Sequence, residues 1–381
     1  MRLRTQLIIF MLLRTILNTM HRMVYPFLSI FARGLGVDIT TLSLVVTARS
    51  FSGVLGPFFA PIADWRGRKF GMLTGIVIFT LGIGLVTVYP NLYTLSAALI
   101  LALFGKYMFD PAMQAYFGDR IPYKQRGTAL AITEMSWSMA FILGIPAMAF
   151  LIVRYGWLVP FPLLIILGML MFIVVLIIVP HQDEHHKPAD NSRDGYYAVF
   201  TSVPALAGIS IALWASAANE LVNLVFGVWL EDSFGLKIAA LAGASAVIGL
   251  SELGGEGLVA LLTDRIGKPR ALMFGLMGNA VAAIMLPFLG KSQLGALIGL
   301  FFFYISFEYV IVSHIPMVSE LVPKARATVL SLNIAGHSIG RALGALLATF
   351  IYQQFGFILV AFSAVVFNVF GLVALRRMLR S

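Results

Sequence analysis

The sequence has no cysteine and is poor in charge. Of its 381 residues, 12% are charged and 60% are hydrophobic, and the mean hydropathy is +0.92. The absence of cysteine excludes disulfides, thiolate metal sites and cysteine nucleophiles. The shortage of charge excludes a chain of ordinary soluble domains, in which about 25% of residues are charged. Because a membrane-spanning helix needs roughly 20 apolar residues, the composition predicts many such helices joined by short loops.

Apolar runs interrupted by charged or turn-forming residues predict an all-α membrane protein with twelve transmembrane helices. The first run continues past Arg14 to Phe31 without a small-residue cleavage site, so it is interpreted as a span and not as a signal peptide. The predicted spans lie near residues 5–30, 41–62, 70–88, 93–117, 127–152, 157–179, 203–229, 238–262, 270–288, 293–318, 327–352 and 357–375.

The basic residues predict the orientation of these spans. Of the 27 Lys and Arg residues, 18 lie outside the spans on the side of the amino terminus and 4 lie in the opposite loops. Because cytoplasmic loops carry the excess of Lys and Arg, both termini are expected in the cytoplasm and the protein in the plasma (inner) membrane. The same bias accounts for the net charge of +10, which therefore does not indicate a nucleic-acid partner.

A motif after the second span returns about two hundred residues later. Asp64-Trp-Arg-Gly-Arg-Lys69 is repeated as Asp264-Arg-Ile-Gly-Lys268 after the eighth span. Asp119-Arg-Ile-Pro122 is likewise repeated as Glu320-Leu-Val-Pro323. The duplication predicts two pseudo-symmetric six-helix bundles joined by a cytoplasmic linker. The predicted boundaries are 1–179 for the first bundle, 180–202 for the linker and 203–381 for the second bundle.

The first copy of this motif resembles a known signature. Ala60-Pro-Ile-Ala-Asp-Trp-Arg-Gly-Arg-Lys69 is similar to the loop between the second and third helices of major facilitator superfamily transporters. The resemblance covers essentially the whole chain and implies two six-helix bundles around a central cavity. The family's loop usually begins with Gly, where this chain has Ala60, and places a basic residue after the Asp, where this chain has Trp65. No subfamily is therefore assigned.

The paired signature loops predict a latch on the cytoplasmic side. Asp64 is expected to approach the positive amino-terminal end of the eleventh helix near Arg326, and Asp264 the start of the fifth helix near Gly127. The alternative is a solvated turn whose charges only fix the topology. The residues assigned to the latch and gate are Asp64, Arg66, Gly67, Arg68, Arg126, Glu134, Asp264, Gly267 and Arg326.

Ionisable residues inside the predicted spans follow a period of three helices. The third, sixth, ninth and twelfth spans contain none, which predicts that these four face lipid while the other eight surround a polar cavity. Polar residues at helical spacing favour substrate binding on several of the eight. The predicted substrate-binding residues are Arg14, Asn18, His21, Arg22, Tyr25, Arg49, Lys106, Asn219, Asn223, Tyr304, His337 and Arg341.

Buried carboxylates are suited to carrying protons, and the chain has no nucleotide motif that would supply energy instead. The predicted coupling residues are Glu308, Glu220, Glu252 and Asp110, the first two preferred for their mid-membrane positions. Lys106 and Asp110 stand one turn apart, so a self-neutralised structural pair is the alternative for them. Glu252 and Glu256 are also one turn apart, which indicates a protonated carboxyl or a basic neighbour such as Arg341.

No metal or cofactor is expected. The tract His181-Gln-Asp-Glu-His-His186 is more typical of a solvated linker than of a metal site. Gly290-Lys-Ser292 resembles the end of a phosphate loop, but Met285 stands where that loop requires glycine.

Together these features predict a secondary active transporter that moves a small organic solute by alternating access, with protons as the expected coupling ion. Gly144-Ile-Pro146 partly matches the fifth-helix pattern of family exporters such as the twelve-helix drug/proton antiporters, which favours export. The alternatives are uptake or symport of a zwitterionic or anionic metabolite and translocation of a lipid-like substrate. A channel, a receptor or a membrane enzyme is disfavoured. The expected partners are the substrate, protons and membrane lipid, and the protein is expected to act as a monomer.

Overall fold

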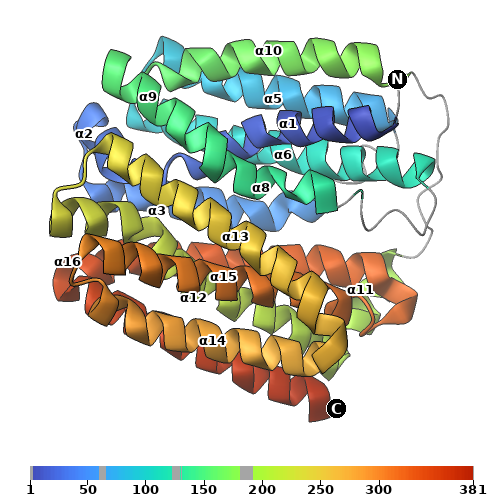
Figure 1. The fold of residues 1–381 in the computed structure, drawn as a ribbon. Coiled ribbons are helices and arrows are strands. Elements are labelled where there is room, and N and C mark those ends of the chain that lie inside the picture. Colours follow the sequence, from blue (N-terminus) through green and yellow to red (C-terminus); the bar gives the residue numbers. More distant parts are fainter. Residues whose placement is uncertain (1–2, 60–65, 122–128, 130, 181–191, 381) are drawn as a thin grey trace. The chain divides into compact units, whose positions relative to one another are not determined.

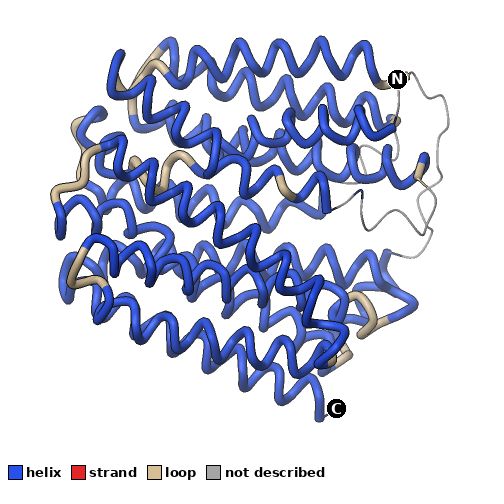
Figure 2. Tube along the Cα trace, viewed as in Figure 1, coloured by secondary structure: helices blue, strands red, loops and turns tan. Residues whose placement is uncertain are grey.

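The computed structural model describes residues 3–59, 66–121, 129, 131–180 and 192–380. Throughout these ranges the regular elements are helices (Figure 1, Figure 2), which confirms the all-α class. Ten helices in the described ranges are long and apolar enough to cross a membrane. One of the ten contains both of the last two predicted spans, and the first helix is not among them. The number twelve therefore stays a prediction.

Contacts divide the chain into two compact units. Unit 1 consists of Met1–Val37 and Leu55–Pro188, and unit 2 of Asp38–Val54 and Ala189–Ser381. Unit 1 contains α1 (Leu3–Arg22), α2 (Leu28–Leu35), α5 (Arg68–Val88), α6 (Leu92–Arg120), α8 (Ser136–Met139), η2 (Ala140–Gly144), α9 (Ile145–Tyr155) and α10 (Pro160–Ile178). Unit 2 contains α3 (Ile39–Ser52), α11 (Ser192–Phe200), α12 (Val203–Phe234), α13 (Ile238–Ile266), α14 (Lys268–Leu289), α15 (Gln293–Val318), η3 (Pro323–Ala325) and α16 (Arg326–Arg380). The short η1 (Gly53–Leu55) lies at the boundary.

Helix α3 comes from the second predicted span, yet it groups with unit 2 because it packs against α16. Ser43 Oγ donates to the carbonyl of Ala345 at 3.3 Å, and Thr40 Oγ1 donates to Gln353 Oε1 at 2.8 Å. Asp38 caps the start of α3 by accepting a hydrogen bond from the Thr41 amide, and this bond holds the pKa of Asp38 below its usual value. This grouping by contacts does not test the predicted bundle boundaries, which stay a prediction.

The first predicted span, 5–30, is wrong in one detail because it is not continuous. Helix α1 ends at Arg22 and α2 begins at Leu28, with a turn between them. Pro26 lies in this turn, and proline has no N–H for a helical hydrogen bond. Gly36 then ends α2 with a φ of 67°, a left-handed conformation that glycine adopts without strain.

Glycines with positive φ recur in both units at nearly the same repeat offset. Gly67 (φ 91°) precedes α5 and Gly267 (φ 87°) precedes α14. Gly156 (φ 96°) ends α9, and Gly356 (φ 76°) divides α16 between its two predicted spans. The backbone thus repeats turn conformations at positions that the two-hundred-residue sequence repeat relates to one another.

The helix at residues 131–155 contains an irregular turn. Its central part, η2, has π-type hydrogen bonding between α8 and α9. Gly144 at the end of η2 lies against Thr19 of α1, where a larger side chain would collide. Unit 1 therefore brings α1 close to this helix (Figure 1).

Candidate functional site

A cluster of buried charges lies in unit 1 among α1, α6 and the helix at residues 131–155. Arg14 is 3% exposed. Its Nε and Nη2 donate to Asp110 Oδ1 and Oδ2 at 3.1 and 3.2 Å, which makes a bidentate pair. Its Nη1 lies 2.7 Å from Glu134 Oε1 and donates to the Thr133 carbonyl at 3.0 Å. One guanidinium therefore holds two carboxylates and a backbone oxygen.

Lys106 completes the cluster. Its Nζ lies 2.6 Å from Asp110 Oδ2, one helical turn away on α6. Two cations and two carboxylates thus balance within one group, as a buried charge requires. We call Arg14, Lys106, Asp110 and Glu134 the ion cluster. Lys106 and Asp110, one turn apart, are thus paired within a larger group that also holds Arg14 and Glu134.

Trp137, one turn beyond Thr133, lies beside two of the cations, Lys106 of the ion cluster and Arg22. Lys106 Nζ lies 4.4 Å from a ring centroid of Trp137, and Arg22 Cζ lies 4.9 Å from one. Arg22 also lies 4.1 Å from the ring of Phe141 in η2. The His21 ring meets Trp137 edge-on at 5.6 Å. Cations over aromatic faces gain electrostatic stabilisation, so Trp137 helps to position Lys106 and Arg22, while His21 packs against it edge-on.

Of the other predicted residues of the first span, Asn18 contacts the same helix and Tyr25 lies beside His21. Asn18 Nδ2 donates to Ser136 Oγ at 3.0 Å, and Tyr25 is buried with its ring 6.4 Å from that of His21. Arg14, Asn18 and His21 share one face of α1 because they are spaced by four and three residues. The polar stripe expected from the sequence is therefore a packed surface against the helix at residues 131–155.

In unit 2 the structure joins three predicted residues of α12 and α15. Tyr304 Oη donates to Asn223 Oδ1 at 2.8 Å, and Asn223 Nδ2 donates to Glu220 Oε2 at 3.4 Å. Glu220 is 1% exposed. Asn219, the neighbour of Glu220 on α12, is also buried. The chain of hydrogen bonds links a candidate coupling carboxyl to a phenol.

The remaining predicted residues lie on other helices of unit 2. His337 of α16 bonds Ser216 of α12 through Nδ1 at 2.7 Å. Glu252 of α13 is buried, whereas Glu308 of α15 is half-buried and packs its Cβ beside Gly255. Arg341 lies in α16, and Arg49 is buried in α3.

A comparison with known proteins decides the family. The model of the Major Facilitator Superfamily matches residues 10–316 and 262–380 of this sequence. The chain belongs to the Major Facilitator Superfamily. Membership makes it a multi-pass membrane transporter that moves a small solute by secondary transport.

Relatives and solved structures agree with this assignment. The chain is 23% identical over 355 residues to the MFS-type transporter YwfA of Bacillus subtilis (strain 168), covering 91% of this chain and 85% of YwfA. It is 24% identical over 371 residues to the sialic acid transporter NanX of Escherichia coli (strain K12), covering 92% and 89% of the two chains. A bacterial homologue of the human lysosomal transporter Spinster has a similar fold, with a TM-score of 0.76, 16% identity and coverage of 99% and 98%. The expected superfamily and fold are thus confirmed.

The superfamily signature loop is only partly described. Arg66 lies over the ring of Phe70 at 5.2 Å, and Arg68 pairs with Asp119 at 3.4 Å. Gly67 and Gly267 hold the positive-φ turns before α5 and α14. Asp64 and Arg126 lie outside the described residues, as do the side chains of Asp264 and Arg326. The latch therefore stays a prediction.

Metal binding is the first of two remaining questions about the site, and the second concerns site residues that sequence reasoning missed. In the described part of the chain, no three His, Cys, Asp or Glu side chains group closely enough to hold a metal. The tract from His181 to His186 lies outside the described residues.

The sequence did not single out Trp137, Phe141 or Gln114. The Nε2 of Gln114 donates to Glu134 at 3.4 Å. The available signal was the position of Trp137, three residues after Glu134 and hence on the same helix face.

Proposed function

We propose that this transporter exports a small amphipathic organic cation in exchange for protons, by alternating access, and that the ion cluster is where the two compete. The observation that carries this proposal is the difference in exposure within the cluster. The Arg14 side chain is 4% exposed, whereas Asp110 is 13% and Glu134 is 39% exposed. A solute that reaches the cluster therefore meets carboxylates first, and carboxylates bind either a proton or a cation.

The double hold on Arg14 supports Glu134 as the exchanging group. When Glu134 takes up a proton or turns to a cationic solute, Arg14 keeps its bidentate pair with Asp110. The buried guanidinium is then never left without an opposite charge, which would be costly. Because a proton and a cation cannot occupy the same carboxylate together, binding of one releases the other.

Uptake of an anionic or zwitterionic solute together with a proton is the second candidate. It is favoured by the two cations, Lys106 and Arg22, that surround Trp137. Protonation of Glu134 would then leave positive charge for the solute's anionic group. Glu220, Glu252 and Glu308 are the candidates for coupling in unit 2 under either mechanism.

Proteoliposomes separate the two candidates. Vesicles loaded with ethidium, benzalkonium or tetraphenylphosphonium and diluted into cation-free buffer should acidify inside as the cation leaves, as read by trapped pyranine. Symport predicts acidification under an inward gradient of succinate or glycine instead. Glu134→Gln should reduce the coupled acidification to that of protein-free vesicles, because the amide cannot exchange a proton. Glu231→Gln, near the carboxyl-terminal end of α12, is the control and should retain the coupled acidification. Coupled acidification that persists in Glu134→Gln would exclude Glu134 as the carboxylate that exchanges the proton for the cation.

A further inference from the structure

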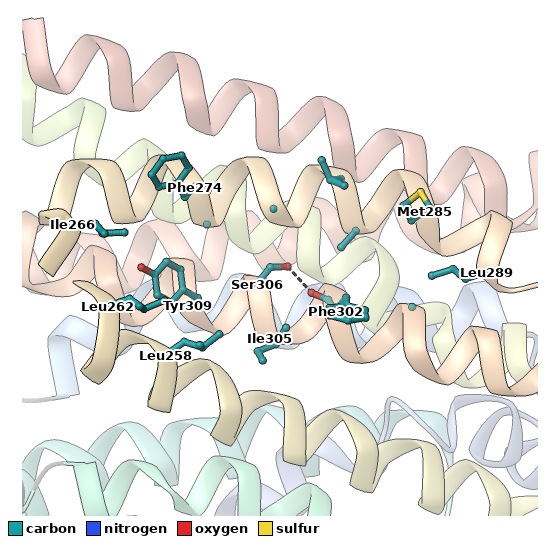
Figure 3. A pocket seen from close by; sticks show the side chains of 15 residues that line it. Leu258, Leu262, Ile266, Phe274, Met285, Leu289, Phe302, Ile305, Ser306 and Tyr309 are labelled. Carbon is teal, nitrogen blue, oxygen red and sulfur yellow. Dashed lines mark hydrogen bonds between the residues drawn. The ribbon is translucent and has the colours of Figure 1, made fainter. Parts of the chain in front are cut away.

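Unit 2 has a cavity that the proposed transport mechanism does not use. It lies among α13, α14 and α15 and has a volume of about 560 Å³ (Figure 3). The side chains around it are nearly all apolar, and Phe274, Met285 and Phe302 are 53%, 45% and 55% exposed. We call it the α14 groove. Since these exposed apolar side chains belong to membrane-spanning helices, the α14 groove is suited to hydrocarbon.

Glycines shape the groove. Gly275 and Gly299 are packed against neighbouring helices so tightly that an added side chain would collide. Gly278 differs, because a Cβ atom there would meet only Ser306 Cβ, at an ordinary 3.8 Å. The space above Gly278 is therefore free within the groove, and a side chain placed there would fill it.

One polar atom in the groove lacks a partner. Tyr309 is 7% exposed, and its hydroxyl makes no hydrogen bond to any described residue. By contrast, Ser306 Oγ donates to the Phe302 carbonyl at 2.7 Å and is satisfied within α15. Figure 3 shows the Tyr309 hydroxyl toward the end of the groove where Leu262 and Ile266 lie. A buried hydroxyl without a partner costs free energy, so it marks a place for an acceptor from a ligand.

Basic residues stand at this same end. Arg265 and Arg270 are exposed, and Lys268 lies between them at the start of α14. Arg265 is seven residues from Leu258, which puts both on nearly the same face of α13. These cations belong to the loops expected on the cytoplasmic side, where anionic lipid headgroups attract Lys and Arg. The groove thus combines an apolar channel, one hydroxyl donor and positive charge at its mouth.

We propose that the α14 groove binds one acyl chain of an anionic phospholipid, with an ester carbonyl accepting from Tyr309 and the phosphate near Arg265 and Arg270. The dimensions suit such a lipid. From Phe274 to Leu289 the groove follows α14 for roughly 22 Å at 1.5 Å per residue, and one leaflet of the hydrocarbon core is about 15 Å deep. The inference does not depend on the direction or the coupling of transport.

Fluorescence quenching by brominated lipid tests the site directly. The chain has no cysteine, so Met285→Cys places a single bimane label in the groove, and Leu81→Cys places one on an exposed position of α5 in unit 1. Each protein is reconstituted with phosphatidylglycerol or phosphatidylcholine brominated in the acyl chain at equal mole fraction. We expect phosphatidylglycerol to quench the label at 285 several-fold more effectively than phosphatidylcholine, and the two lipids to quench the label at 81 alike. Equal quenching by both lipids at 285 would overturn the proposal.

Three variants and one control variant then locate the lipid. Gly278→Leu should remove the preference for phosphatidylglycerol at 285 by filling the groove, while Gly84→Leu, at a glycine of α5 with open space around it, should leave it unchanged. Arg265→Gln with Arg270→Gln should make the two lipids equivalent, and Tyr309→Phe should weaken the quenching by both. A preference that survives both Gly278→Leu and the double arginine variant would place the lipid elsewhere. Unaltered thermal unfolding of the variants identifies those that keep the fold.

Discussion

Each unit contains a group of buried polar side chains, and the two groups satisfy their charges and hydrogen-bonding atoms in different ways. The ion cluster of unit 1 neutralises two cations with two carboxylates. In unit 2, Asn279 Nδ2 donates to the Phe303 carbonyl at 2.8 Å, and Asn368 Nδ2 donates to Asn279 Oδ1 at 2.8 Å. We call Asn279 and Asn368 the amide pair. Both of its members are 1% exposed, whereas Glu134 in the ion cluster is 39% exposed.

The difference separates a group that can exchange partners from one that fixes helices. The amide pair ties α14, α15 and α16 together with neutral hydrogen bonds that need no charge balance. In the ion cluster, Asp110 pairs with both Arg14 and Lys106, so the most exposed member, Glu134, can meet a solute while each buried cation keeps a carboxylate. A buried polar group in a membrane helix thus indicates function mainly when charge and access occur together.

The largest expected effect comes from breaking the charge balance. Asp110→Asn leaves Arg14 paired with Glu134 but removes the carboxylate that pairs with Lys106, and we expect unfolding to become easier by about 3–5 kcal/mol. Thermal unfolding in detergent measures the change. The double variant Asp110→Asn with Lys106→Met restores neutrality and should recover part of the loss. A double variant as unstable as the single one would show that charge balance does not hold the cluster together.

A smaller effect is expected in the amide pair. Asn279→Leu removes the bond to Phe303 and leaves Asn368 with its bond to the Ala364 carbonyl, so we expect a loss of about 1–3 kcal/mol. The same unfolding assay applies, and coupled transport should remain in the folded protein. Loss of proton coupling with unchanged stability would mean that the amide pair takes part in transport.

The smallest stability effect is expected at Tyr304. Tyr304→Phe removes one neutral hydrogen bond to Asn223, and such bonds between membrane helices contribute about 0.6 kcal/mol on average. Transport is the sharper measurement, because a changed pH dependence would connect the Glu220 chain of hydrogen bonds with coupling. An unchanged pH profile would assign that chain a packing role like that of the amide pair.

Much of the fold follows from apolar runs, because a span in lipid must satisfy its own backbone hydrogen bonds. The predicted span 293–318 coincides with α15, where Ser292 caps the first turn by accepting from the Gly295 amide. The first span was wrong at its turn, because Pro26 lies inside an apolar run that continues on both sides. Helix α11 was not foreseen, because it lies in the segment interpreted as a polar linker.

The candidate site was predictable as a set of residues but not as a set of contacts. Charge inside spans marked Arg14, Lys106, Asp110 and Glu134, since such residues are rare in lipid. Only the Lys106–Asp110 pair is local in sequence, one turn apart. Arg14 meets Asp110 across 96 residues, and no helical periodicity relates two such distant positions. Trp137 was missed because aromatic residues are common in apolar spans and carry no charge that would single them out.

The π-type turn η2 determines where this helix can lose a residue. Its hydrogen bonds close over five residues and not four, so this stretch holds one residue more than an α-helix would need. We expect that deletion of Ile142 converts η2 to a regular turn while Trp137 and Met148 keep their present neighbours. Deletion of Ala112 from α6 would instead rotate everything beyond it by about 100°. Insertions and deletions in this protein's relatives are therefore expected to gather at η2, where a membrane helix can lose a residue without losing its register.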